Sequence, residues 1–88
     1  MAHRHGRRLR GAHVAAIAKT DLSCSEENRR SLQTIVRDVI HTSCIDRVAA
    51  CDNHGKVVVT ASCPTAGTAN AFSKRASKWG RMLKSAGR

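Results

Sequence analysis

The fold of this chain is decided by residues 45–63, which read IDRVAACDNHGKVVVTASC. Two short runs that suit β-strands, 45–51 and 56–63, are separated by the turn formers at 52–55. β-Branched residues pack well on a pleated surface, and Gly55 can take the positive φ that a tight turn demands. The stretch therefore predicts a β-hairpin in the middle of a chain of 88 residues.

The alternation of side chains along each strand predicts which residues face the core. Val57, Val59 and Ala61 fall on one face of the second run. With a tight turn, Val48 and Ala50 of the first run join them opposite the preceding helix. The sequence fits a loop of about two to four residues, so the register stays open between these lengths.

An amphipathic helix is predicted before the hairpin. Ser23 with Glu26 has the form of a capping box, and Ser25 is the alternative cap. Apolar residues then recur at the spacing of one buried stripe, formed by Leu32, Ile35, Val36, Val39 and Ile40. The solvent face carries Arg30, Thr34, Arg37 and His41. We expect the stripe to pack on the sheet, because burying each such side chain contributes roughly 1.5–3 kcal/mol before entropy.

A second amphipathic helix is predicted after the hairpin. Pro64 ends the strand, and Thr65 or Thr68 can cap the helix. Its apolar stripe consists of Ala69, Phe72, Ala76, Trp79 and Leu83. We expect Gly80 to end or kink this helix, with Gly87 as the other plausible stop.

The segment 12–19 is ambiguous. Val14, Ala16 and Ala18 alternate as in a strand, but the alanine content also suits a helix. The predicted fold class is therefore α+β, a small two-layer α/β sandwich in the order (β or α)-α-β-β-α with two helices on one face of the hairpin sheet. We expect residues 1–11 to form a flexible basic arm and residues 12–88 to form a single small α/β domain.

A two-stranded sheet is barely sufficient for such a sandwich. Either the segment 12–19 supplies a third strand, or a second copy of the chain extends the sheet. The exposed edge therefore predicts a homodimer.

The charges of the chain are segregated. The formal net charge is +10, yet all six acidic residues lie between Asp21 and Asp52. Acid-free basic segments on either side favour a polyanionic partner, and phosphates attract such groups. The predicted nucleic-acid-binding residues are Arg4, Arg7, Arg8, Arg10, Lys74, Arg75, Lys78, Arg81, Lys84 and Arg88.

Base-specific recognition has less support. Single-stranded nucleic acid is usually read by aromatic stacking, and here only Phe72 and Trp79 are available, both on the predicted core stripe. The sequence therefore predicts a non-enzymatic module that binds nucleic acid through phosphate contacts with little sequence specificity. The alternatives are an adaptor for anionic membranes or a protein partner, and a structural domain that dimerises through its sheet edge.

Four cysteines, Cys24, Cys44, Cys51 and Cys63, allow two interpretations. Two disulfides would need an oxidising compartment, and the N-terminus makes a poor export signal. We therefore expect reduced, mostly buried thiols and favour an intracellular location. A metal site built on His41-x-x-Cys44 is a weaker hypothesis, and no metal site is predicted. No catalytic group, cofactor or small-molecule substrate is predicted either.

Residues 55–64, GKVVVTASCP, resemble a BON domain, in which a Gly-led alternating strand precedes a small or Pro-containing turn and an Ala-rich helix. Ala69, Ala71 and Ala76 supply the alanines, and the resemblance extends over residues 28–80. Ala61 stands where that family often has Gly, and its final strand is missing. The resemblance implies an α/β sandwich that binds phospholipid surfaces or other proteins, often in a bacterial envelope.

Overall fold

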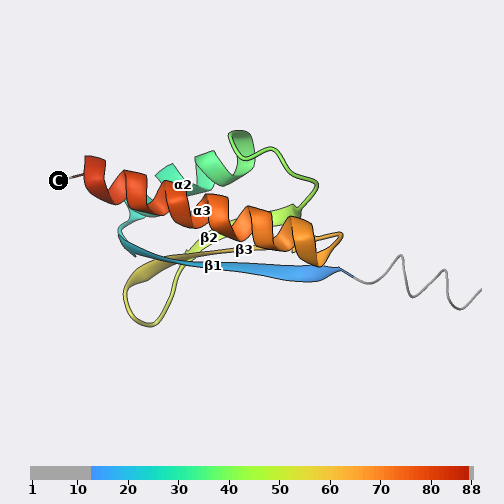
Figure 1. The fold of residues 1–88 in the computed structure, drawn as a ribbon. Helices are drawn as coiled ribbons and strands as arrows, with labels where there is room; N and C mark the ends of the chain where they lie inside the picture. Colours follow the sequence, from blue (N-terminus) through green and yellow to red (C-terminus); the bar gives the residue numbers. More distant parts are fainter. Residues whose placement is uncertain (1–12, 88) are drawn as a thin grey trace, which may run out of the picture.

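Three antiparallel strands carry two helices on one face (Figure 1). The computed structural model describes residues 13–87. Its elements are β1 (Val14–Ser23), α2 (Glu26–Asp38), β2 (Ile45–Cys51), β3 (Lys56–Cys63) and α3 (Ala66–Ala86). The strand order is β1-β3-β2. The predicted α+β sandwich is confirmed, and the ambiguous segment is a strand that completes the sheet. Among the described residues, no helix has the length and apolarity needed to cross a bilayer.

The hairpin has the predicted strand limits but a different register. Asp52 Oδ1 accepts hydrogen bonds from the backbone N–H groups of His54 at 2.8 Å and Lys56 at 2.9 Å, and Gly55 takes a φ of +76°. The resulting four-residue turn places Ala49, not its neighbours, opposite the buried Val59. The expectation that Val48 and Ala50 face the helices is therefore wrong, because a one-residue change of register reverses every side chain.

The N-terminus of α2 is capped by Ser25 and not by Ser23, which belongs to β1. Ser25 Oγ accepts a hydrogen bond from the Asn28 N–H at 3.0 Å. The predicted stripe is confirmed at three of its five positions, which are buried: Leu32, Val36 and Ile40. Val39 instead lies past the last helical residue and is exposed.

Helix α3 begins at the predicted cap and runs through Gly80. The Thr65 side chain accepts a hydrogen bond from the Thr68 N–H, and the Thr68 side chain accepts one from the Thr65 N–H. Gly80 is buried in the helix, which continues to Gly87 at its C-cap. The expectation of a kink or stop at Gly80 is wrong, because the missing side chain makes room for the sheet.

The edge of β2 is covered by side chains of α2. The Gln33 carboxamide donates to the Arg47 carbonyl at 2.9 Å and accepts from the Ala49 N–H at 2.8 Å. Arg29 also donates to the Ala49 carbonyl at 3.3 Å. These hydrogen bonds occupy backbone groups of β2 that a neighbouring strand would otherwise bind. The edge formed by β2 therefore differs from the edge formed by β1.

All four cysteines are joined in disulfides, Cys24–Cys51 and Cys44–Cys63. The expectation of reduced thiols is wrong, because the fold brings together cysteines that are 27 and 19 residues apart. Cys44 and Cys63 are buried in the core, whereas Cys51 is exposed. The sulfurs are thereby unavailable to the metal site considered at His41. Disulfides are typical of oxidising compartments, which removes one reason for favouring an intracellular location.

Candidate nucleic-acid interface

The exposed face of α3 carries the described part of the predicted binding site. The helix is anchored by its opposite face, where Ala69, Phe72 and Ala76 are buried in the core. Five cations, and no acidic residue, lie along its 21 residues: Lys74, Arg75, Lys78, Arg81 and Lys84. All five are exposed. We call them the α3 cations.

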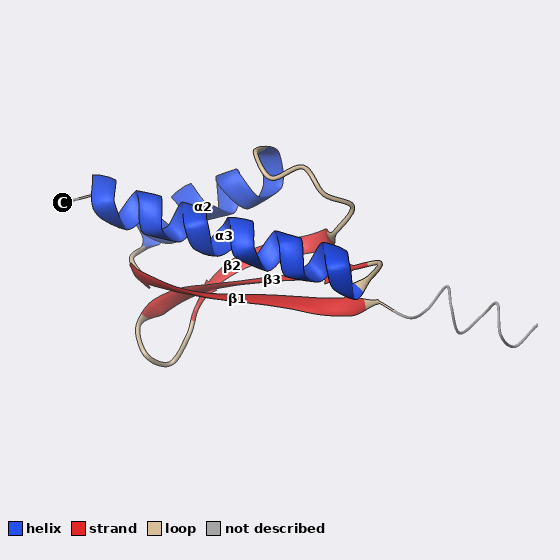
Figure 2. Ribbon diagram, viewed as in Figure 1, coloured by secondary structure: helices blue, strands red, loops and turns tan. Residues whose placement is uncertain are grey.

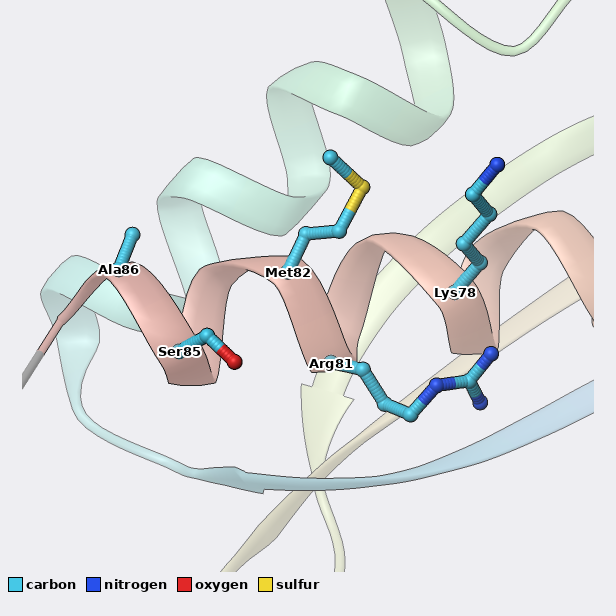
Figure 3. A pocket seen from close by; sticks show the side chains of 5 residues that line it. All are labelled: Lys78, Arg81, Met82, Ser85 and Ala86. Carbon is cyan, nitrogen blue, oxygen red and sulfur yellow. The ribbon is translucent and has the colours of Figure 1, made fainter.

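Three of the α3 cations form a line. Lys74, Lys78 and Arg81 are spaced by four and three residues, which is the spacing of neighbours on one helix face. At the α-helical rise, the line is about 10 Å long. In Figure 3 the side chain of Lys78 leaves the helix on the side of α2, whereas Arg81 extends toward β1. The line therefore presents positive charge over the width of the helix.

Arg75 and Lys78 border a hollow of about 220 Å³ between α2 and α3. Its other lining residues are apolar: Val39, Ile40, Trp79 and Met82. The hollow thus places two cations beside an apolar floor, an arrangement that suits the long stems of basic side chains.

Lys84 lies on the other side of the line. It shares a hollow with Asp21, Arg81 and Ser85. Asp21 is therefore an acidic group close to the α3 cations, although it forms no ion pair with them.

Among the described acidic residues, Glu26 is the one that forms ion pairs, and its partners lie on α2. In the part of the chain that the structure describes, the only ion pairs join Glu26 to Arg29 at 2.7 Å and to Arg30 at 2.9 Å. Hydrogen bonds from these two arginines hold the pKa of the Glu26 carboxyl below its ordinary value. The α3 cations are therefore left without a carboxylate partner within residues 13–87.

The structure brings together half of the predicted site. Lys74, Lys78 and Arg81 share one helix face, and Arg75 and Lys84 lie to either side of it. The remaining predicted residues, Arg4, Arg7, Arg8, Arg10 and Arg88, lie outside the described residues.

The sequence reasoning missed that the backbone of Lys19 in β1 lies beside α3. Lys19 lines a hollow with Ser77 and Arg81, and the Ser77 hydroxyl donates to the Lys19 carbonyl at 3.4 Å. These two residues are 58 positions apart. Strand alternation indicates that Lys19 is exposed, but no local signal places β1 beside α3.

A scan of protein-family models, a search of curated proteins and a search of solved structures each gave no match to this chain. The resemblance to a BON domain therefore rests on the sequence motif alone, and the function has to be argued from the geometry and charge of α3.

Proposed function

We propose that this protein is a non-enzymatic module that binds nucleic acid through phosphate contacts, with little sequence specificity. The observation that carries the proposal is the set of α3 cations, exposed on one helix and free of carboxylate partners within the described residues. When such a row of cations neutralises phosphates, the counterions condensed on the nucleic acid are released, which makes association favourable at low salt.

The aromatic residues support phosphate contact over base recognition. Phe72 is fully buried, and Trp79 is partly buried against the core. The Phe72 ring therefore offers no free face on which an unpaired base stacks, and the Trp79 ring is partly used in packing against the core. Arginine can grip a phosphate with two parallel hydrogen bonds, while lysine acts as a point charge. The α3 cations combine both kinds of contact.

The test is a salt titration of duplex binding with matched variants. Lys74→Gln/Lys78→Gln/Arg81→Gln removes the central line, and Arg30→Gln/Arg37→Gln/Lys56→Gln removes three cations from outside α3. Both variants fall from +10 to +7 by formal charge. The α3 variant should bind every duplex sequence more weakly, with a log–log salt slope shallower by about 2.7 if each residue neutralises one phosphate. The control should keep most of its affinity and slope.

Equal losses in the two variants would show that only net charge matters, and salt-independent or undetectable binding to both DNA and RNA would remove the proposal. The adaptor alternative has a separate readout, because each basic residue near an anionic bilayer contributes about 1 kcal/mol. Sedimentation with phosphatidylserine vesicles in the absence of nucleic-acid binding would support that alternative instead.

A further inference from the structure

The face of the sheet that points away from the helices is largely apolar. The strand register aligns Ile17 of β1, Thr60 of β3 and Val48 of β2 in one row across the sheet. Ile45 lies in the row on one side, and Val58 lies beside Lys19 in the row on the other side. We call this surface the outer sheet face.

Its branched side chains are strongly exposed for their type. Ile17 is 58%, Ile45 is 52% and Val48 is 47% exposed. Both helices lie on the opposite side of the sheet (Figure 2), so no described element covers this surface. A cluster of exposed aliphatic residues that spans three strands is typical of an interaction site.

The charge distribution argues against several occupants. A bilayer or a nucleic acid would be drawn to the α3 cations, which lie on the far side of the sheet from Ile17 and Val48. Residues 1–12 carry four Arg, and their only large apolar side chains are Met1 and Leu9. The composition of that segment therefore offers few apolar side chains to match the aliphatic residues of the outer sheet face.

We propose that the outer sheet face binds a second copy of this chain, sheet against sheet. Two chains of formal charge +10 repel each other, so self-association needs a surface with little charge. The outer sheet face meets this condition, because Lys19 is the one charged residue in the three rows described above. Packed sheets lie about 10 Å apart, and each carries its helices on the outside.

The same charges disfavour pairing through the edge of β1. Gly80 of α3 lies against Thr20 of β1, so an edge dimer would bring the two α3 helices side by side. Back-to-back packing instead separates the two sets of α3 cations by both sheets, which is more than the Debye length of about 8 Å at physiological salt. If the proposed function holds, such a dimer presents two outward cationic faces and can bridge two duplexes.

Analytical ultracentrifugation of the full chain, without nucleic acid, tests the dimer. Val48→Lys places a charge in the interface, and Val39→Lys adds the same charge at a residue of similar exposure, 44%, outside the sheet. We expect the wild type to form a dimer that strengthens with salt, as the repulsion is screened. Val48→Lys should raise the dissociation constant at least about tenfold, because the added charge is buried without a partner. Val39→Lys should leave the dissociation constant unchanged.

Far-ultraviolet circular dichroism checks that both variants are folded. A wild type that stays monomeric at high salt and high concentration would overturn the inference. A dimer that Val48→Lys leaves intact would also overturn the inference. Val48 lies on β2, at the opposite edge of the sheet from β1, so such a dimer would pair through the edge of β1. The Gln variant of α3 should dimerise at least as well as the wild type, so a failure of nucleic-acid binding and a failure of dimerisation are separable.

Discussion

Gly80 lies directly against Thr20, and this contact brings α3 down onto β1. A Cβ atom built on Gly80 would come within 2.8 Å of Thr20 Cγ2 and 2.9 Å of Thr20 Cβ. The Thr20 side chain has little freedom to move away, because its hydroxyl donates to the Val57 carbonyl at 2.7 Å. The glycine therefore sets how closely the helix that bears the cations approaches the sheet.

Gly80→Ala should destabilise the protein, although the same change in an open helix stabilises by about 1 kcal/mol. Overpacking at such a contact typically costs about 1–3 kcal/mol, so a net loss of about 1–2 kcal/mol is expected. Gly67→Ala in the first turn of the same helix is the control, because its Cβ would meet nothing nearer than 3.8 Å. Urea unfolding measures both. A Gly80→Ala variant as stable as Gly67→Ala would contradict the close packing.

Arg47 should be among the side chains whose loss destabilises the fold most. Its guanidinium donates to the carbonyls of Ile40 at 2.6 Å, Thr42 at 2.7 Å and Val36 and Cys44 at 2.8 Å. Arg47→Met should cost about 3 kcal/mol, because several part-buried carbonyls lose a charged donor at once. Arg37→Met, at an exposed helix position, should change stability by less than about 0.5 kcal/mol. Equal denaturation midpoints would contradict the bracing role of Arg47.

Each disulfide should contribute to stability through the loop that it closes. Separations of 27 and 19 residues correspond to about 3–4 kcal/mol each in the chain-entropy description. The pair Cys44→Ala/Cys63→Ala should be the more damaging, because both side chains are buried in the core and Cys51 of the other pair is exposed. Thermal unfolding of the two double variants measures the difference. Thiol labelling of the unfolded, unreduced protein should detect no free cysteine.

Asp52 should make folding stability depend on acid pH. The backbone N–H of Lys56, and then that of His54, holds the pKa of the Asp52 carboxyl below its usual 3.8. Since the folded-state pKa is the lower one, the stabilisation is complete above the unfolded-state pKa and is lost as the pH falls through the folded-state pKa.

As the pH is lowered from neutral to about 2, the thermal unfolding midpoint should therefore fall less steeply for Asp52→Asn than for the wild type. Glu27→Gln is the control, because the Glu27 side chain makes no hydrogen bond within residues 13–87. The same acid slope in Asp52→Asn and in the wild type would contradict the role of the turn.

The sequence by itself determined the two helices, the hairpin and the face of α3 that carries the cations. These features follow from local periods of about 3.6 and 2 residues and from turn and cap chemistry at positions such as Gly55 and Thr65. The same reasoning could predict that Lys74, Lys78 and Arg81 share one exposed face, because helix geometry relates residues four and three positions apart.

Only the tertiary structure decided which surfaces those elements present. It turned Val48 outward through the length of the turn, joined cysteines 27 and 19 residues apart, and placed Lys19 beside Arg81. It also turned Gly80 from an expected helix stop into a close contact with Thr20. Such relationships depend on distances between residues far apart in the chain, and no local period or propensity encodes those distances.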